Sequence, residues 1–270
     1  MAAKKRVDVA LVERGLAASR EKAQALVMSG VVYIGENKVT KASLTVNDED
    51  ELIVRQNGHG YVSRGALKLE KGLKVFGVDP NGIVAMDLGA STGGFTDVLL
   101  QNGASHVYAI DVGYGQLDWK LRNDPRVTVM ERTNARYLTA QDLPLKPTLG
   151  VMDVSFISIT KILPAAAQIM GEEGAFISLI KPQFEAGRER VGKKGVVRDA
   201  QVHRDVIQEI LTFIDTQMGW TAQALSFSPI TGPEGNIEFL VYILPTGRAT
   251  HHVTAEEVEQ VVAAAHESLR

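Results

Sequence analysis

The sequence predicts a doubly wound α/β domain on a mostly parallel sheet, preceded by a small α+β unit. Buried apolar runs alternate with amphipathic stretches between residues 83 and 218. Charged residues directly follow several of these runs, at the carboxyl edge where parallel sheets bind ligands. The last two apolar runs, 223–227 and 237–243, are too close for a crossover helix and should pair antiparallel.

Composition limits the class of protein. The 270 residues are enough for a large core and one or two domains. A hydrophobic content of 45% with 23% charged residues is typical of a soluble globular protein. The net charge of −3 gives no general affinity for nucleic acid, so such binding must come from local patches. No apolar run approaches the ~20 residues that span a bilayer, and Asp8 and Glu13 interrupt any signal-peptide core, so we expect a cytoplasmic protein.

The chain contains no cysteine. This excludes disulfides, methylation of a pyrimidine C5 by way of a thiolate adduct, and cysteine-ligated iron–sulfur chemistry. Group transfer to an oxygen or a nitrogen nucleophile stays open.

Residues 1–57 are predicted to form the small N-terminal unit. Two short helices end at Gly15 and Gly30, and Ser19 caps the second one. Short strands are expected at 31–34 and 51–54. A flexible junction follows, so we expect a linker at 58–63 and a larger domain over 64–270.

The start of this unit is basic, with six basic against three acidic residues between positions 4 and 22. We expect Arg6, Arg20 and Lys22 to contact RNA phosphates, although charge alone favours an ordinary solvated helical face. The stretch R-V-D-V-A-L-V-E-R-G-L-A-A-S-R-E-K-A-Q-A-L-V-M-S-G-V-V-Y-I resembles an S4-type RNA-binding domain.

A nucleotide pocket is predicted at the start of the α/β sheet. The apolar run 83–88 meets a glycine-rich turn at 89–94, and a helix signal begins at Phe95. Glycines let a ligand approach the backbone, and the first helical N–H groups point at it. A plain surface turn is the alternative.

The turn favours S-adenosylmethionine over NAD. Ser91 stands where the dinucleotide fingerprint requires its second glycine. Asp87, two residues before Gly89, would repel a pyrophosphate but suits a positively charged amino group. Asp111 follows Gly89 by 22 residues, the position of a carboxylate that binds a ribose diol, which both cofactors contain.

Asn134 is assigned to the adenine edge, although a plain turn residue explains it equally well. The residues predicted to bind the cofactor are Asp87, Gly89, Ala90, Ser91, Thr92, Gly93, Gly94, Phe95, Asp111, Val112, Asn134 and Asp153. Further strands are expected at 107–111, 127–130, 149–153 and 174–180, helices at 116–121 and 202–218, and a last helix after the capping box at 254–257.

A glycine-rich basic loop lies between residues 183 and 202. Seven basic and three acidic residues occur from Lys181 to Arg204. Such a long loop beside a predicted site favours a flap that substrate phosphates order, with a disordered solvent loop as the alternative. Further residues assigned to RNA binding are Arg64, Arg188, Arg190, Lys193 and Lys194.

Four ionisable residues are predicted to meet at one edge of the sheet: Lys68, Asp153, Lys181 and Glu238. Lys68 by itself would be interpreted as a surface lysine whose stem covers apolar surface. The contexts S-R-G-A-L-K-L, V-M-D-V-S-F, L-I-K-P-Q-F and G-N-I-E-F resemble the Lys-Asp-Lys-Glu tetrad of FtsJ-like RNA 2′-O-methyltransferases. With D-L-G-A-S-T-G-G-F-T, D-V-G-Y-G-Q-L and L-R-N-D-P-R-V, the chain resembles the TlyA family, whose members are named hemolysins but resemble ribosomal RNA 2′-O-methyltransferases.

This resemblance implies a Rossmann-like S-adenosylmethionine-dependent methyltransferase sheet with a C-terminal antiparallel hairpin. It implies the four residues as catalytic, S-adenosylmethionine as cofactor, and ribosomal RNA in ribosomal subunits as partner. The implied target is a cytidine ribose in one subunit or in both. No metal ion and no membrane are implied.

A ribose hydroxyl must lose its proton as it attacks a sulfonium methyl, so a base is needed within hydrogen-bond reach. Lys181 is the candidate base, or it stays protonated and stabilises the developing alkoxide. Burial and Lys68 would lower its pKa, whereas Asp153 and Glu238 would oppose that change. Asp153 is also a candidate to hold the amino group of the cofactor.

Two other functions stay open. One is a non-catalytic RNA-binding protein that retains a cofactor site. The other is a membrane-active hemolysin, although the sequence has no strongly amphipathic, aromatic-rich cationic helix.

Overall fold

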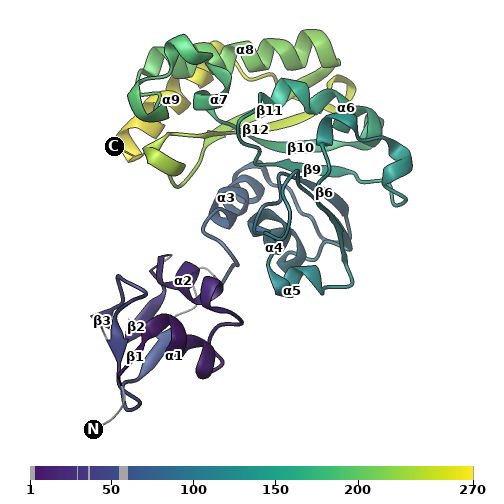
Figure 1. Ribbon diagram of the computed structural model, residues 1–270. Helices are drawn as coiled ribbons and strands as arrows, with labels where there is room; N and C mark the ends of the chain where they lie inside the picture. Colours follow the sequence, from purple (N-terminus) through teal and green to yellow (C-terminus); the bar gives the residue numbers. More distant parts are fainter. Residues whose placement is uncertain (1–3, 29, 36, 55–59, 270) are drawn as a thin grey trace. The chain divides into compact units, whose positions relative to one another are not determined.

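A computed structural model describes residues 4–28, 30–35, 37–54 and 60–269. Contacts within the chain divide it into two compact units, Met1–Gly60 and Tyr61–Arg270 (Figure 1). Gly58 and His59 of the predicted linker lie outside the described residues. Tyr61 and Val62 pack against the core of the second unit, and the Val62 N–H donates a hydrogen bond to Asp97 Oδ2 at 2.9 Å. The second unit therefore begins its packing before residue 64.

The N-terminal unit has two helices, α1 (Val7–Glu13) and α2 (Arg20–Met28), and short antiparallel strands. A three-stranded sheet has the order β3-β2-β5, and β1 pairs with β4. The predicted helices and the two predicted strands are confirmed. The two-residue strands β1, β3 and β4 were missed because two residues show no alternation. The strand bounds are β1 Lys5–Arg6, β2 Val32–Ile34, β3 Asn37–Lys38, β4 Thr45–Val46 and β5 Leu52–Val54.

The second unit is built on a seven-stranded sheet with the order β11-β12-β10-β9-β6-β7-β8. The strand β12 runs antiparallel to both of its neighbours, and the pairs formed by β6 to β10 are parallel. The predicted fold class, with its C-terminal antiparallel hairpin, is confirmed. The strands are β6 (Val84–Leu88), β7 (His106–Ile110), β8 (Val127–Met130), β9 (Leu149–Met152), β10 (Ala175–Ile180), β11 (Trp220–Phe227) and β12 (Phe239–Pro245).

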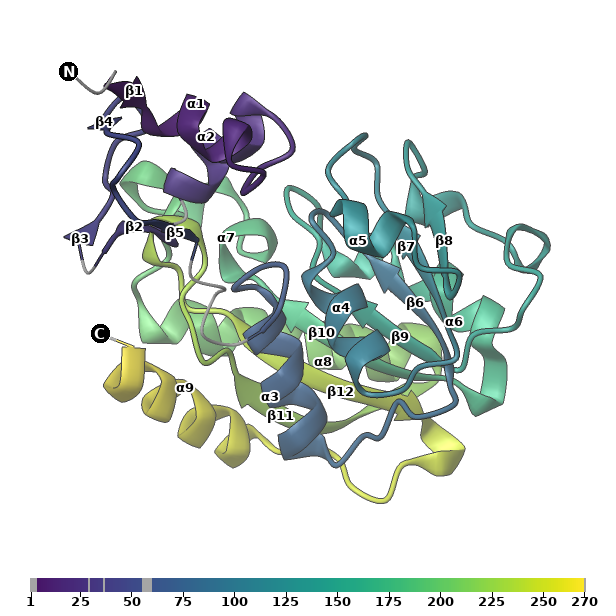
Figure 2. The same cartoon turned by 90° about the horizontal axis from the view of Figure 1, so that it is seen from below.

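Helices cover both faces of this sheet (Figure 2). One face packs against α6 (Leu163–Met170), α8 (Ala200–Met218) and α9 (Ala255–Leu269), around Phe176 and Phe239. The other packs against α3 (Ala66–Phe76), α4 (Gly94–Gln101) and α5 (Trp119–Arg122), around Leu69 and Leu99. The long apolar strands are therefore buried on both sides, as parallel sheets require.

Three segments differ from expectation or extend it. The helix predicted at 116–121 is reduced to the four residues of α5. It begins only at Trp119, because the Asp118 side chain caps it there by accepting the Lys120 N–H at 2.9 Å. The helix α6 was not predicted. The basic loop begins with α7 (Pro182–Glu185) and continues through two short 3₁₀ turns, Arg188–Arg190 and Lys193–Gly195. The capping box is confirmed: Thr254 N–H donates to Glu257, and Glu257 N–H donates to Thr254 Oγ1.

Gly150 allows two central strands to pack. A Cβ atom at this position of β9 would overlap the ring of Phe176. We expect Gly150→Ala to lower the free energy of unfolding by about 1–3 kcal/mol, the usual cost of overpacking a core. Urea denaturation measures this change. Gly247→Ala is the control, since a Cβ there meets no atom within 4 Å; an equal loss in both variants would contradict the packing argument.

Candidate active site

The sheet topology brings the four predicted tetrad residues to one edge. Asp153 directly follows β9 and Lys181 directly follows β10, which run parallel. Glu238 directly precedes β12, and Phe239 pairs with Ile180 in the antiparallel register. The amino end of β12 therefore lies beside the carboxyl end of β10. Lys68 comes from the first turns of α3.

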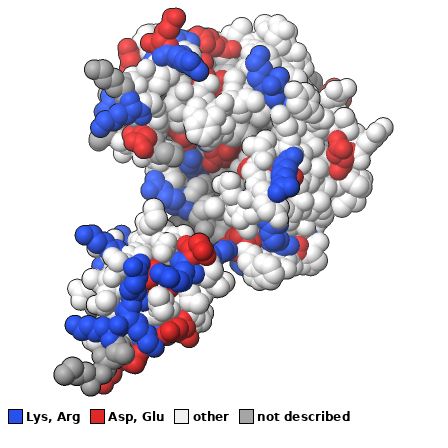
Figure 3. All heavy atoms as spheres, viewed as in Figure 1, with Lys and Arg blue, Asp and Glu red and all other residues white. Residues whose placement is uncertain are grey.

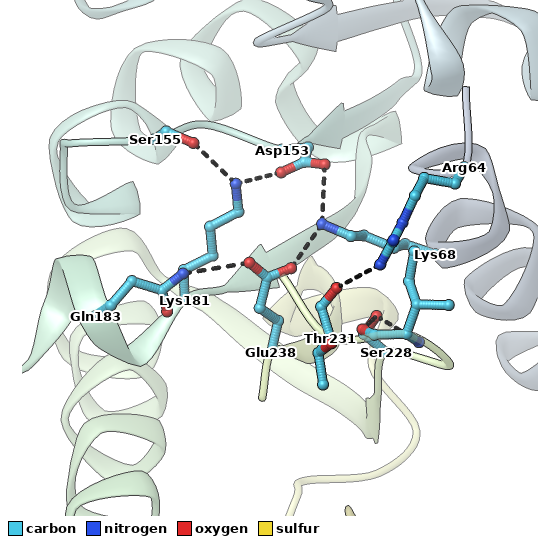
Figure 4. Close-up of polar contacts among 10 residues, drawn as sticks. Arg64, Lys68, Asp153, Ser155, Lys181, Gln183, Ser228, Thr231 and Glu238 are labelled. Atoms are coloured by element: carbon cyan, nitrogen blue, oxygen red, sulfur yellow. Dashed lines mark hydrogen bonds and ion pairs between the residues drawn. The ribbon is translucent and has the colours of Figure 1, made fainter. Parts of the chain in front are cut away.

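The four side chains point toward one another (Figure 4). Lys68 Nζ lies 2.6 Å from Glu238 Oε2 and 3.5 Å from Asp153 Oδ2. The other oxygen of Asp153 forms an ion pair with Lys181 Nζ. Carboxylates and ammonium groups thus alternate along a continuous chain of contacts.

This cluster is largely withdrawn from water. Lys68 and Lys181 are each 6% exposed, and Glu238 is fully buried. Buried charges are tolerated when they are paired, and here two cations balance two anions. Burial lowers the pKa of Lys68, but the charges of Asp153 and Glu238 outweigh it and raise this pKa above its ordinary value. Lys68 therefore stays charged and holds the two carboxylates together.

Three neighbours extend the cluster, and the sequence did not assign two of them. Lys181 Nζ donates a hydrogen bond to Ser155 Oγ at 3.1 Å, and Gln183 Nε2 donates to Glu238 Oε1 at 3.3 Å. The guanidinium of Arg64 donates to the Thr231 carbonyl at 3.1 Å. Ser155 and Gln183 stand in the quoted motifs V-M-D-V-S-F and L-I-K-P-Q-F, two residues after Asp153 and Lys181. That position was their only sequence signal.

A cavity of about 480 Å³ opens beside the tetrad at the carboxyl edge of the sheet. This is within the range of about 300–1,000 Å³ for small-molecule sites. The predicted cofactor residues that line it are Gly89, Ser91, Asp111, Val112, Asn134 and Asp153. Gln116, Thr133, Ile157 and Ile162 also line it and were not predicted.

Gly89 and Asp111 shape this cavity. A Cβ on Gly89 would lie 2.8 Å from the Asp153 carbonyl oxygen, so only glycine lets the loop pass the end of β9. The carboxylate of Asp111 accepts the N–H groups of Ser91 at 2.8 Å and Gly113 at 2.7 Å. Its oxygens thus face the cavity from a fixed position.

The other predicted cofactor residues do not line the cavity. Ala90, Thr92, Gly93, Gly94 and Phe95 form the turn behind it and the start of α4. Asp87 is fully buried, and its Oδ2 accepts a hydrogen bond from Thr96 Oγ1 at 2.7 Å. Its Oδ1 has no partner among the residues described. Burial raises the pKa of Asp87 to about 7, aided by the charge of Asp153 and opposed by the Thr96 hydrogen bond.

In the first unit, two arginines that were predicted to contact RNA form ion pairs with a buried aspartate. Arg6 and Arg20 lie 2.9 and 3.2 Å from the carboxylate of Asp8, which is fully buried. Hydrogen bonds from Arg6, Gln24 and Arg20 hold the pKa of Asp8 below its usual range despite its burial. Both arginines keep about half of their side chains exposed, and Lys22 is exposed. Lysine and arginine occupy much of the face of this unit seen in Figure 3.

The predicted RNA contacts of the basic loop fall into two groups. Arg190 pairs with Glu209 of α8 at 3.0 Å. Arg188 and Lys194 are exposed and form no ion pair within the part of the chain that the structure describes. The side chain of Lys193 lies outside the described residues.

Neither a membrane-spanning helix nor a metal cluster is found in the described ranges. No helix there is long and apolar enough to cross a bilayer. No three His, Cys, Asp or Glu side chains in the same ranges are grouped as metal ligands would be.

The sheet order, the cavity at its carboxyl edge and the paired charges beside it define a methyltransferase of the Rossmann-like class. Comparison with known proteins identifies the family. Residues 61–243 match the FtsJ-like methyltransferase family and residues 5–52 match the S4 domain. The chain belongs to the FtsJ-like methyltransferase family.

Relatives extend this match over nearly the whole chain. YqxC of Bacillus subtilis is 50% identical, over 99% of this chain and 96% of that protein. The 16S/23S rRNA (cytidine-2′-O)-methyltransferase TlyA of Mycobacterium tuberculosis is 44% identical, over 90% of this chain and 91% of its own. A solved structure from Streptococcus thermophilus, 44% identical, covers 99% of this chain and 98% of that chain with a TM-score of 0.78.

The buried acid Asp87 should make stability depend on pH. An unfolded aspartate titrates near pH 4, whereas folded Asp87 titrates near pH 7. Between these values the folded protein binds the additional proton, so this contribution to the free energy of unfolding falls as pH rises. Asp87→Asn should remove that fall, because an amide oxygen still accepts from Thr96 and does not titrate.

Urea denaturation without added ligand, at pH 5, 6, 7 and 8, measures the difference between wild type and Asp87→Asn. The exposed Asp215→Asn is the control and should follow the wild-type curve. A difference between wild type and Asp87→Asn that stays constant over this range would contradict the expected titration.

Proposed function

We propose that this protein transfers a methyl group from S-adenosylmethionine to the ribose 2′-hydroxyl of a cytidine in ribosomal RNA. The observation that carries the proposal is the continuous chain of ion pairs among Lys68, Asp153, Lys181 and Glu238 beside a nucleoside-sized cavity. The activity of the TlyA relative supports the ribose and the cytidine.

The domains divide this work in the proposal. Residues 1–57 form an S4-like RNA-binding domain and 64–270 the methyltransferase domain; residues 58–63 join them, and Tyr61 and Val62 of this linker already pack against the second domain. The S4 match and the basic start of the chain support docking on a ribosomal subunit in the cytoplasm.

The cavity residues fit S-adenosylmethionine, which supplies an electrophilic methyl group when bound. Asp111 accepts hydrogen bonds from the ribose diol. Val112 and Ile162 offer apolar surface to the adenine, and Asn134 a polar edge. Asp153 and the backbone at Gly89 bind the amino acid end. In the proposal, Asp87 stabilises the turn through its hydrogen bond with Thr96 and does not contact the cofactor.

Lys181 acts on the ribose hydroxyl in this proposal. It either accepts the hydroxyl proton or holds a positive charge against the developing alkoxide, as Asp153 and Ser155 orient it. Lys68 keeps Asp153 and Glu238 fixed. A Lys181→Arg variant separates the two roles, because arginine keeps the charge but does not act as a base.

The target nucleotide enters beside Phe156 in the proposal. This ring is 91% exposed and lines both the first cavity and a second one of about 420 Å³. The second cavity is also lined by Gln183, Phe184 and Arg188. An exposed aromatic face can stack on an unpaired base, and enzymes that modify nucleotides flip them out of the stack.

Removing Lys181 should abolish catalysis without preventing cofactor binding. We expect Lys181→Ala to lower the methylation rate by about 10³-fold or more, since both proposed roles disappear. Tritium transfer to ribosomal subunits measures the rate, and calorimetry measures S-adenosylmethionine affinity. Lys74→Ala, an exposed lysine of α3, should leave both unchanged. Normal turnover of Lys181→Ala would refute the assigned role.

The basic loop should contribute salt-dependent RNA binding. We expect Arg188→Ala combined with Lys194→Ala to reduce the slope of log affinity against log salt by about 1.5, because each phosphate contact contributes about 0.7–0.9. Filter binding of ribosomal RNA between 50 and 300 mM salt checks this, with Lys74→Ala as control. An unchanged slope would remove the loop from the RNA interface.

The target itself needs direct mapping. Ribose methyl groups should be mapped on ribosomal RNA of both subunits from strains with and without this protein. A cytidine 2′-O-methyl group that depends on the protein is expected. Methylation that falls only on a base, or no difference between the strains, would overturn the proposal.

A further inference from the structure

Asn236 is a buried amide that joins two distant segments of the second unit. It is 3% exposed. Its Oδ1 accepts the Val197 N–H at 3.0 Å, and its Nδ2 donates to the Gly195 carbonyl at 2.9 Å. Both partners belong to the main chain of the basic loop. A buried side chain that satisfies two backbone groups fixes their relative position.

The first segment is the part of the basic loop that lines the second cavity, the one of about 420 Å³. Gly195 lines that cavity together with Gly187, Arg188 and Gly192 of the same loop. Since Asn236 holds the Gly195 carbonyl, it sets where this wall stands.

The second segment carries Glu238. Asn236 precedes it by two residues, and the Asn236 carbonyl accepts the Gly232 N–H at 2.8 Å, which closes the turn. Glu238 packs directly under that turn: a Cβ on Gly232 would overlap its carboxylate. A shift of Asn236 would therefore shift the turn that packs against the Glu238 carboxylate, which pairs with Lys68.

A further contact anchors the loop from the opposite side. The Val197 carbonyl lies 3.2 Å from His203 Nε2, and His203 Nδ1 lies 2.8 Å from His266 Nε2 of α9. A carbonyl only accepts, so His203 Nε2 donates to it, and the other nitrogen of the ring shares a hydrogen bond with His266. Val197 is thus held by α8 at its carbonyl and by Asn236 at its N–H.

We propose that Asn236 is a positioning residue that couples the RNA-facing loop to the catalytic carboxylate Glu238. The inference rests on the proposed function and deepens it. When the loop takes up the target nucleotide, Asn236 transmits its position to the turn above Glu238. Asn236 itself touches neither the cofactor nor the reacting oxygen.

The test compares Asn236→Ala and Asn236→Asp with Asn102→Ala. The side-chain amide of Asn102 also donates a hydrogen bond to a backbone carbonyl, that of Val98 at 2.8 Å. Asn102 lies at the end of α4 and serves as the control. Aspartate is nearly isosteric and keeps the acceptor for the Val197 N–H, but it turns an oxygen instead of the Nδ2 donor toward the Gly195 carbonyl.

We expect Asn236→Ala to lower kcat about tenfold or more and to raise KM for RNA, with KM for S-adenosylmethionine within about twofold of wild type. Asn236→Asp should be at least as impaired as Asn236→Ala, because it buries a carboxylate oxygen against the Gly195 carbonyl. Asn102→Ala should keep all three constants.

Amide hydrogen exchange gives a readout that needs no catalysis. The segment containing Val197 should exchange about tenfold faster or more in Asn236→Ala and in Asn236→Asp, and at the wild-type rate in Asn102→Ala. Kinetics and exchange that match Asn102→Ala would overturn the inference. A wild-type protein inactive on RNA would instead overturn the proposed function, and the exchange result would still be readable.

Discussion

The antiparallel pairing of β12 with β10 is the constraint on which the site depends. Parallel strands alone bring side chains together only at their carboxyl ends. Reversing one strand brings an amino end to the same edge, and the pairing of Ile180 with Phe239 sets Glu238 beside Lys181. A slip of one residue in this register would turn Glu238 to the other face of the sheet. The chemistry of the cluster thus depends on backbone hydrogen bonds within the core.

Charge balance explains why these residues can stay buried together. A lone buried carboxylate or ammonium would shift its pKa and lose its charge. Here Lys68 bridges two carboxylates, and Lys181 has Asp153 on one side and the Ser155 hydroxyl on the other. Each charged group is satisfied by members of opposite charge, so removing one leaves its neighbours exposed to the full cost of burial.

Strand runs and strand-end charges are local signals, so the sequence was sufficient for the fold class. The convergence of the tetrad was implied by the family resemblance of four motif contexts, since spacing alone does not bring distant residues together. The sequence was insufficient where side-chain direction decides. Asp87 has the right position for a cofactor ligand, yet its carboxyl points below the turn to Thr96. The ion pairs of Arg6 and Arg20 with Asp8 were not foreseen, because the burial of Asp8 depends on tertiary packing. Ser155, Gln183 and Asn236 are common residue types whose partners lie 26 to 55 residues away along the chain.

Phe156 has a consequence for how the two proposed ligands affect each other's affinity. Its ring packs against that of Phe184, with the ring centroids 5.0 Å apart. The same ring is a common wall of both cavities. Any coupling free energy between two ligands that both contact this ring is reciprocal. In the proposed function these ligands are the target nucleotide and the methyl donor, so the factor by which the nucleotide alters the affinity for the donor equals the factor by which the donor alters the affinity for the nucleotide.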